Sequence, residues 1–263
     1  MIDFHSHILP NIDDGARSIE ETYNMIKEAE KAGFDTILLT PHYIENYYET
    51  SIEETEIWLD VVLQNLQQKY VQTDLLLASE IFISDNIMNL LIDGKASTIN
   101  NTSYVLLELP LDVEPENLYN IISEMKQNKL VPVISHPERY LYVQKEPDLV
   151  YDLIEKGVLM QMNYGSIIGQ YGKKAELLAE KLLENNMIHF LGTNAHREHT
   201  IYERIPNILE ILKEKIGETR LEELTTINPN LAIHNKRIDI RKPIRFELTK
   251  QEKVKMFFSG FRK

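Results

Sequence analysis

The sequence predicts an α/β protein, a distorted (β/α)7 TIM-like barrel with its site at the C-terminal ends of the strands. Seven apolar runs rich in β-forming residues recur along the chain, and segments with helical apolar spacing separate most of them. Such continuous apolar strands are usually buried on both faces of a parallel sheet, and seven repeats favour a closed barrel over an open sheet. The runs are IDFHSH, TILLTPH, LLLASEIFI, YVLLELP, VPVISHP, VLMQMNYG and HFLGTNAH.

The segments between these strands carry helix signals. The first predicted helix covers residues 18–32, where Ser18 and Glu21 form a capping box at the start and Gly33 follows the end. After the last strand, residues 206–226 are predicted to form one more amphipathic helix. The other predicted helices cover residues 53–70, 116–129, 147–157 and 173–186.

Composition limits the classes of function. The chain has 263 residues, 43% of them hydrophobic, which is enough for one catalytic domain with a sizeable core. We find neither a run of about 18 apolar residues nor a secretory leader pattern, so we expect a cytoplasmic protein. The lack of cysteine excludes disulfides, Cys-ligated zinc and a cysteine nucleophile. The net charge of −13 argues against nucleic-acid binding.

The charge is distributed unevenly along the chain. We expect a barrel domain over residues 1–235 and a basic extension over 236–263, which holds ten Lys/Arg against three Asp/Glu. This local charge of +7 leaves −20 on the rest of the chain. The extension ends in KMFFSGFRK, with three phenylalanines among cations. Two interpretations stay open: a packed or solvated terminal segment, or a contact for an anionic membrane surface or an acidic partner.

Potential metal ligands lie at the ends of almost all the predicted strands. In a βα barrel these ends open on one face, so side chains scattered along the sequence converge there. His5 and His7 share one side of their strand because side chains alternate, which makes them a natural chelate for one ion. A single His at a strand end is more often a satisfied polar group than a ligand, but leaving so many buried polar groups unpaired is costly. We expect His189, His199 and His234, which show no such placement, to be structural or surface residues. The candidate residues are His5, His7, Asp13, Asp14, His42, Glu80, Glu108, His136, Asn194 and His196.

With these residues in place, the chain resembles the PHP superfamily of polymerases and histidinol phosphatases. DFHSH, the TPH that ends at His42, Glu80, SHPERY and GTNAH follow that family's order. More narrowly, MIDFHSHILPNIDDG, LLTPHY, SEI, LLELP and VPVISHPER are similar to the manganese-dependent tyrosine phosphatases of bacterial capsule and exopolysaccharide clusters. The resemblance runs from residue 1 to about residue 199, and it is the combination of motifs that makes it specific.

The resemblance implies a barrel that holds three divalent metal ions. It implies His5, His7, Glu80 and Asn194 for the first ion, Glu80, Glu108 and His136 for the second, and Asp14, His42 and His196 for the third. We assign Asp13 to supporting a ligand rather than to ligation. Mixed imidazole and carboxylate ligation suits manganese, iron or zinc, and manganese is the preference of the family.

One residue departs from the family pattern. The family has Asp in SDAH or TDAH, whereas this chain has Asn194 in GTNAH. An amide oxygen can coordinate a metal but brings no charge. Three divalent ions with Asp14, Glu80 and Glu108 then leave about +3, where an aspartate would leave about +2. We expect weaker binding of the first ion and stronger binding of an anion. A natural variant, a mark of reduced activity and an engineered change all fit Asn194.

A cationic cluster of this kind suits a phosphate monoester. Two metals would lower the pKa of a bridging water, which attacks phosphorus in line. Arg139, in HPER, is the predicted catalytic and phosphate-binding cation, with a salt bridge to a carboxylate as the alternative, and Arg197 is a weaker candidate. Tyr43 and Tyr47, with Tyr48 beside them, are predicted substrate contacts in the loop HYIENYYETS, and a partly packed loop is the alternative.

The resemblance implies a protein-tyrosine phosphatase whose substrate is the Tyr-rich tail of a bacterial tyrosine kinase that controls polysaccharide assembly. Two other functions stay open. The first is a small-molecule phosphomonoesterase of the histidinol-phosphatase type, which comparative rates on a phosphotyrosyl peptide and histidinol phosphate would separate. The second is a non-catalytic phosphotyrosine-binding protein, weakened at Asn194.

Overall fold

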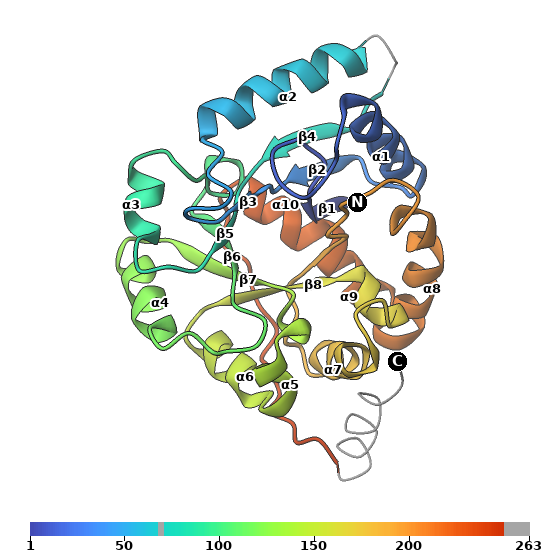
Figure 1. The fold of residues 1–263 in the computed structure, drawn as a ribbon. Helices are drawn as coiled ribbons and strands as arrows, with labels where there is room; N and C mark the ends of the chain where they lie inside the picture. The colour runs from blue at the N-terminus through green and yellow to red at the C-terminus, as the bar shows by residue number, and fades with distance from the viewer. Residues whose placement is uncertain (68–70, 250–263) are drawn as a thin grey trace.

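The protein is built around a ring of parallel strands surrounded by helices (Figure 1). The computed structural model describes residues 1–67 and 71–249. The strands are β1 (Ile2–Ser6), β2 (Thr36–Leu39), β3 (His42–Tyr43), β4 (Asp74–Leu77), β5 (Glu80–Phe82), β6 (Tyr104–Glu108), β7 (Val131–Ser135), β8 (Leu159–Asn163) and β9 (Phe190–Gly192).

Seven predicted strand runs are confirmed, and two of them are interrupted. The predicted run TILLTPH, residues 36–42, divides into β2 and β3, and the run LLLASEIFI, residues 75–83, divides into β4 and β5. The strands pair in the orders β1-β2-β4 and β3-β5-β6-β7-β8-β9, always parallel. Beyond β9, the amide of Asn194 donates to the His5 carbonyl (2.7 Å) and the amide of His7 donates to the Ala195 carbonyl (2.9 Å). These bonds join the end of β9 to β1, as the predicted barrel requires.

Helices surround the barrel, most of them on its outside and α10 across its base (Figure 1). They are α1 (Ile19–Lys31), α2 (Ile52–Gln67), α3 (Ile87–Ile92), α4 (Leu118–Gln127), α5 (Leu141–Lys145), α6 (Asp148–Glu155), α7 (Lys173–Glu184), α8 (Ile205–Ile216), α9 (Glu218–Glu222) and α10 (Asn228–Ile233). The predicted start of α1 is confirmed, because the Ser18 hydroxyl accepts from the Glu21 amide (3.1 Å). The Glu21 carboxylate, however, accepts from the Arg17 amide (2.8 Å) rather than from the cap residue.

The prediction of a single helix over residues 206–226 was wrong. Gly217 ends α8 with φ of 78°, a left-handed conformation that glycine adopts without a Cβ clash. The chain restarts as α9, passes through a π-helical turn at Glu223–Ile227 and continues as α10. This break turns α10 to pack against β1 at the base of the barrel.

The barrel interior is apolar at its base and polar at its mouth. The lower interior is filled by the apolar cluster that includes Phe4, Leu38, Leu106, Val133, Leu159 and Phe190, with Ala232 and Ile233 of α10. The rings of Phe4 and Phe190 stack with centroids 3.9 Å apart. Because strand side chains alternate, the same inward face continues upward from Leu106 to Glu108 and from Leu159 to Gln161. The strands therefore present polar residues at the mouth.

An irregularity in β1 places two neighbouring side chains inside the barrel. The register of β1 against β2 shifts between Asp3 and Ser6, as at a β-bulge. Phe4 packs in the interior cluster, and the next residue, His5, also meets an interior side chain, Gln161. The bulge thus lets β1 contribute both to the apolar base and to the polar mouth.

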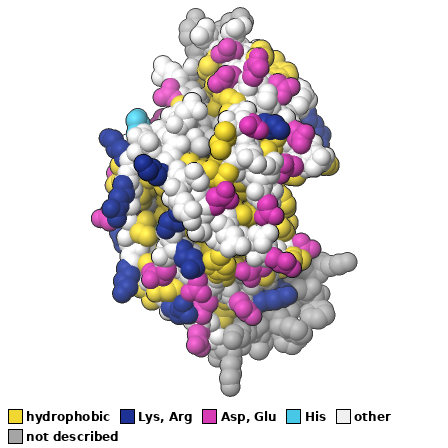
Figure 2. Space-filling view, turned by 90° about the vertical axis from the view of Figure 1, so that its left-hand side faces the viewer, with side chains coloured by type: hydrophobic (Ala, Val, Ile, Leu, Met, Phe, Trp, Pro, Cys, Tyr) yellow, Lys and Arg dark blue, Asp and Glu magenta, His cyan; other side chains and the backbone are white. Residues whose placement is uncertain are grey.

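Residues 236–249 run along the barrel without regular secondary structure. Ile238 and Leu248 are buried, and the Arg241 guanidinium pairs with Glu223 (2.6 Å). The KMFFSGFRK segment lies outside the described residues, so the contact suggested for the basic extension stays a prediction. In the side view of Figure 2, the visible Lys and Arg gather mainly along the left edge, while Asp and Glu spread across the face. None of the helices in residues 1–67 and 71–249 is long and apolar enough to cross a membrane.

Candidate metal centre at the barrel mouth

The mouth of the barrel contains a cavity of about 400 Å³. Its lining includes Asp14, His42, Glu108, His136, Arg139, Tyr171, Asn194, His196 and Arg197. His5, His7 and Glu80 lie directly beneath, with almost no exposed surface. The structure therefore brings all nine predicted ligand side chains to one end of the barrel.

His5, His7 and Glu80 form the buried floor of the cluster. The Nε2 atoms of His5 and His7 lie 3.1 Å and 3.4 Å from the same Glu80 oxygen, Oε2. The two Nε2 atoms are themselves 3.0 Å apart. Three potential ligand atoms thus converge on one small volume, as the first predicted ion requires.

The hydrogen bonds of the Nδ1 atoms of His5 and His7 determine whether the Nε2 atoms have a proton or a lone pair. His5 Nδ1 donates to Gln161 Oε1 (2.9 Å), and the Gln161 amide nitrogen donates in turn to Asn163 Oδ1 (3.1 Å). His7 Nδ1 donates to Asp13 Oδ2 (2.7 Å), the supporting role predicted for Asp13. A neutral imidazole protonated at Nδ1 has a lone pair at Nε2. Both lone pairs then face the Glu80 carboxylate, and a cation between them would relieve the repulsion.

The central carboxylates are held by further histidines. His136 Nε2 lies 3.2 Å from Glu80 Oε1 and 3.6 Å from Glu108 Oε1. His42 Nδ1 lies 3.1 Å from Glu80 Oε2 and 3.6 Å from Glu108 Oε2. Glu80 therefore stands between the floor and the Glu108 side of the cluster, which fits the bridging position predicted for it.

Burial and mutual charge shift the pKa values of this set in opposite directions. Burial and the neighbouring Glu80 raise the pKa of Glu108 to about 7. Burial alone would raise the pKa of Glu80, but His5 and His42 hold it well below its usual range. Burial lowers the pKa of His42, yet Glu80 and Glu108 outweigh it and raise this pKa to about 9. Burial lowers the pKa of His136 to about 3, which favours its neutral, ligand-competent form.

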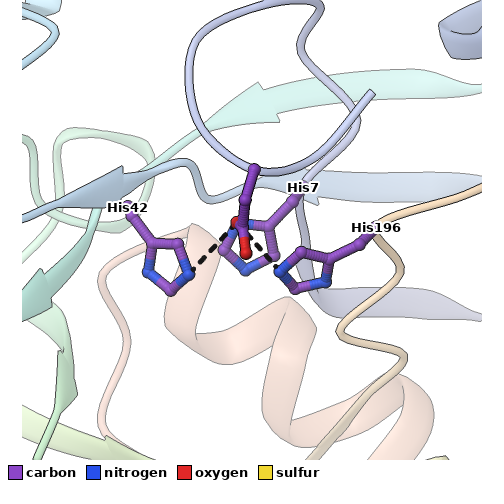
Figure 3. A group of neighbouring side chains, drawn as sticks. His7, His42 and His196 are labelled. Carbon is purple, nitrogen blue, oxygen red and sulfur yellow. Dashed lines mark ion pairs between the residues drawn. The ribbon is translucent and has the colours of Figure 1, made fainter. Parts of the chain in front are cut away.

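A second group of ligands lies at the rim. His42 and His196 point from opposite sides toward the Asp14 carboxylate, with His7 between them (Figure 3). The Asp14 Oδ1 atom is 3.3 Å from His196 Nε2 and 3.6 Å from His42 Nε2. His196 Nδ1 donates to the Asn194 carbonyl (2.9 Å), so its Nε2 lone pair also faces a carboxylate. This is the set predicted for the third ion, with His7 close enough to join it.

Asn194 and His136 both occupy left-handed backbone conformations at strand ends. Their φ angles are 51° and 34°, in a region that Asn, Asp and His enter more readily than most residues. The turn at Asn194 leaves its side chain 8% exposed, with a buried Oδ1 atom that has no hydrogen-bond partner. Unpartnered acceptors of this kind are rare in folded proteins.

The residues present fit a group of metal ions. Among the ligand residues, the buried atoms without a hydrogen-bond partner are His42 Nδ1, Glu80 Oε1, Glu80 Oε2, His136 Nδ1 and Asn194 Oδ1; other such atoms among the described residues include Glu138 Oε2. Except for His136 Nδ1, these atoms belong to the polar interior of the mouth, where the predicted ligands meet. Imidazole nitrogens with carboxylate and amide oxygens form a donor set that suits manganese, iron or zinc.

The two predicted arginines occupy different positions. The Arg139 guanidinium lies 4.6 Å from the centre of the Tyr171 ring, and it makes no ion pair with any described residue. It is therefore available to an anion in the cavity. Arg197 instead donates to the backbone carbonyls of Asp14 (2.7 Å), Gly15 and His196 (2.6 Å), so it ties the loop that carries Asp14 to the end of β9.

The predicted aromatic contacts divide between core and surface. Tyr43 is 3% exposed and packs in the outer core, so this prediction is corrected: its ring is not available to a substrate at the surface. The physical reason is strand alternation, which turns Tyr43 away from the face that His42 presents to the mouth. Tyr47 is 74% exposed and packs edge-to-face on Tyr48, whose ring lies parallel to that of His42.

Three side chains of the mouth were absent from the sequence prediction. Gln161 orients His5, and Tyr171 supports Arg139. Glu138, fully buried, accepts from the Ser166 hydroxyl (2.6 Å) and the Asn163 amide (3.1 Å), which anchors the turn that carries Arg139. A signal existed for Gln161, since it is a lone polar residue at an inward position of an apolar strand.

The histidines predicted to be structural or surface residues lie outside the cavity lining. His189 is buried, and its Nδ1 accepts from the Met160 amide (3.0 Å). His199 is exposed and pairs with Glu28 (2.8 Å), and His234 is exposed and bonded to the Asn230 carbonyl. That these three residues have structural or surface roles stays a prediction.

Together, the fold and the site define an α/β barrel protein with a candidate metal centre at the mouth of the barrel. The chain belongs to the CpsB/CapC family, described as capsular polysaccharide synthesis, whose model matches residues 1–234. The tyrosine-protein phosphatase YwqE of Bacillus subtilis (strain 168) is 31% identical over 258 residues, covering 98% of this chain and 100% of that protein.

Solved structures of other proteins have the same fold as this chain. A structure from the set described as YwqE from Bacillus subtilis and CpsB from Streptococcus pneumoniae, unique metal-dependent tyrosine phosphatases, matches with a TM-score of 0.90 at 30% identity. The match covers 94% of this chain and 100% of that one. A histidinol phosphate phosphatase from Lactococcus lactis, solved with zinc, L-histidinol and phosphate, shares the fold at a TM-score of 0.52 and 15% identity, covering 82% of this chain and 93% of that one. These matches confirm the predicted barrel and the resemblance.

Proposed function

We propose that this protein is a metal-dependent phosphatase that hydrolyses phosphotyrosine. The observation that carries the proposal is the combination of a buried His and carboxylate cluster with a free guanidinium, Arg139, in one cavity. The matched YwqE and CpsB structures are described as metal-dependent tyrosine phosphatases, which supports the same activity here.

We propose three divalent ions, most simply Mn²⁺, on the nine ligand residues. His5, His7, Glu80 and Asn194 would hold the first ion, Glu80, Glu108 and His136 the second, and Asp14, His42 and His196 the third. The contacts support the core of this division. His5, His7 and Glu80 place their donor atoms around one volume, and Asp14, His42 and His196 do so together with His7. His136 Nε2 lies near both Glu80 and Glu108, and His42 Nδ1 lies near the same two carboxylates, so His42 stands between the second and third sets. Because His7 also lies within reach of the third set, it is the residue that couples the two ends of the cluster.

The residues of the chain prepare the site for phosphate. When bound, the ions supply a hydroxide near neutral pH and neutralise the phosphoryl oxygens. Gln161 and Asp13 hold the imidazoles of His5 and His7 in the ligating tautomer, which removes reorganisation during catalysis. Arg139 provides a planar fork that can grip two phosphate oxygens. The phenolate leaving group, with a conjugate acid of pKa about 10, needs less protonation than an alkoxide.

The accessible rim favours a protein substrate. Asp14 and His196 are 54% and 28% exposed in their side chains, so the third ligand set lies near the surface. A phosphotyrosine on a flexible segment could reach it, and Tyr47 and Tyr48 offer aromatic surface beside it. We propose the tyrosine-rich tail of a bacterial tyrosine kinase in capsule or exopolysaccharide synthesis as the substrate, in keeping with the family.

The test measures phosphate release from a phosphotyrosyl peptide, a phosphoseryl peptide of the same sequence and histidinol phosphate. Each is assayed with Mn²⁺ and with EDTA, and the bound metal is counted by mass spectrometry. We expect Mn²⁺-dependent hydrolysis with the phosphotyrosyl peptide as the best substrate. Faster hydrolysis of histidinol phosphate would assign a small-molecule function, and binding of the phosphopeptide without hydrolysis would assign a non-catalytic one.

A further inference from the structure

A second cavity adjoins the metal centre. It has a volume of about 400 Å³ and shares two lining residues, Arg139 and Tyr171, with the mouth. Because the guanidinium of Arg139 lies over the Tyr171 ring, this stacked pair forms the boundary between the two cavities. We call the second cavity the flanking groove and define it by Leu111, Leu141, Lys173 and Lys174 with the shared pair.

One wall of the flanking groove is apolar. Leu111 and Leu141, both in the lining of the groove, are 42% and 46% exposed, which are large values for leucines. The backbone between them is well anchored, because the Leu141 amide donates to the Leu111 carbonyl (2.7 Å). The wall is therefore preformed and does not need to assemble around a ligand.

The opposite wall is cationic. Lys173 and Lys174 begin α7, where the helix dipole adds positive potential. Lys173 pairs with Glu176 (2.5 Å), whereas Lys174 makes no ion pair with a described residue. No carboxylate is among the described residues that line the groove. In a chain of net charge −13, two free cations, Lys174 and Arg139, thus stand beside exposed leucines.

We propose that the flanking groove binds the residues next to the phosphotyrosine of a peptide substrate, and that it selects an acidic side chain beside an apolar one. The proposal rests on the proposed function, since it requires phosphotyrosine at the metal centre. Arg139 contacts the phosphate from one side of the boundary, and an extended peptide advances about 3.3–3.6 Å per residue. Residues one to three positions away from the phosphotyrosine then pass over Leu111 and Leu141, and a carboxylate meets Lys174.

The test compares three kinds of phosphotyrosyl peptide on the Mn²⁺-loaded protein, which differ only in the two residues that flank the phosphotyrosine. The flanking pair is Leu with Glu, Leu with Lys, or Ala with Ala. Each pair is placed before the phosphotyrosine in one peptide and after it in another. Every rate is divided by the same enzyme's rate with p-nitrophenyl phosphate, which has no flank. We expect kcat/KM to be about tenfold higher for the Leu-Glu peptide than for the Leu-Lys peptide on at least one side, through KM.

The variant Lys174→Glu should shrink this preference about three- to tenfold. Lys95→Glu changes the net charge equally at an exposed lysine that lines neither cavity, and it should keep the preference. Equal kcat/KM for all three flanks on the unmodified protein would overturn the proposal without any variant. So would a preference that survives Lys174→Glu, or a dimer in light scattering that Lys174→Glu dissociates, since a second copy would then occupy the groove.

The two proposals fail in different ways. If the unmodified protein hydrolyses neither p-nitrophenyl phosphate nor any phosphopeptide, the phosphatase proposal is refuted, and the proposal for the flanking groove, which depends on it, is refuted as well. If it hydrolyses both and ignores the flanks, only the flanking groove is refuted.

Discussion

Replacing Asn194 by Asp adds a single charge at the one proposed ligand position that holds a neutral amide. The structure indicates that the backbone will accept the change, because the φ of 51° lies in a region that Asn and Asp both populate. The side chain is 8% exposed, and Oδ1 has no hydrogen-bond partner. The new carboxylate would therefore stand in a buried position of the cavity that Asp14 and Glu108 also line.

The substitution Asn194→Asp should lower the stability of the metal-free protein and raise that of the metal-bound protein. In EDTA, an uncompensated buried carboxylate costs about 2 kcal/mol, which lowers Tm by about 4–8 °C in a chain of this size. With a cation present, a unit charge about 4 Å away contributes about 4 kcal/mol at an effective dielectric constant of about 20. Desolvation of the carboxylate offsets roughly half of this. The remaining 2 kcal/mol or so corresponds to roughly 30-fold tighter metal binding.

Two assays on one Mn²⁺ titration check the reasoning. Calorimetry gives Tm with EDTA and with increasing Mn²⁺, and hydrolysis of p-nitrophenyl phosphate gives the half-saturating Mn²⁺ concentration. Asn89→Asp, which adds the same charge at an exposed position on α3, is the control and should change neither quantity. A half-saturating concentration that Asn194→Asp leaves within twofold of the original, with equal Tm in EDTA, would refute the view that Asn194 weakens the first ion.

Three further predictions follow from contacts around the mouth. Asp13→Ala removes the acceptor that fixes the His7 tautomer, so the half-saturating Mn²⁺ concentration should rise about 10- to 100-fold; an unchanged value would contradict this role. Arg139→Lys keeps the charge but loses the fork, so KM for p-nitrophenyl phosphate should rise about tenfold, and Arg139→Ala should lose more; equal KM values would exclude phosphate contact. Burial raises the pKa of Glu138 from 4.5 to about 7, so its carboxyl stays protonated in the folded protein over a range where the unfolded chain ionises. The contribution of Glu138 to stability is therefore complete below pH 4.5 and falls by about 3 kcal/mol as the pH rises to about 7, so Glu138→Gln should reduce the loss of stability over this range by about that amount in urea unfolding of the metal-free protein.

Strand alternation explains why most of the fold and mouth were predictable. Leu106 and Glu108 lie on the same face of their strand, as do Leu159 and Gln161 on theirs. The change from apolar to polar residues at every second position therefore predicts an apolar base and a polar mouth. The same rule identifies Tyr43 as a core residue, because it follows the inward-facing His42. The error over residues 206–226 has a different origin: an apolar helical stripe continues across Gly217, while the backbone does not.

The contacts that orient the ligands depend on tertiary structure. His5 and Gln161 are 156 positions apart, and they meet only because β1 carries a bulge that turns both Phe4 and His5 inward. Tyr171 lies in the segment that follows β8, and nothing in its sequence surroundings indicates that Arg139 would rest on it. Sequence patterns placed the ligands at the mouth and indicated Asp13 as a supporting residue, but they did not pair Gln161 with His5 or the Asn194 carbonyl with His196.

The hydrogen-bond partners of the histidines determine the electrostatics of the mouth. Gln161 Oε1, Asp13 Oδ2 and the Asn194 carbonyl each accept a hydrogen bond from the Nδ1–H of a histidine, which leaves the Nε2 lone pairs of His5, His7 and His196 facing Glu80 or Asp14. Burial, with His196 and His42, lowers the pKa of His7, so protonation does not readily supply the missing positive charge there. Lone pairs and carboxylates at about 3 Å are mutually repulsive unless a cation lies between them. The fold thus holds in place a set of donors that is more stable with metal than without, and the strained turns at His136 and Asn194 are maintained by the same surroundings.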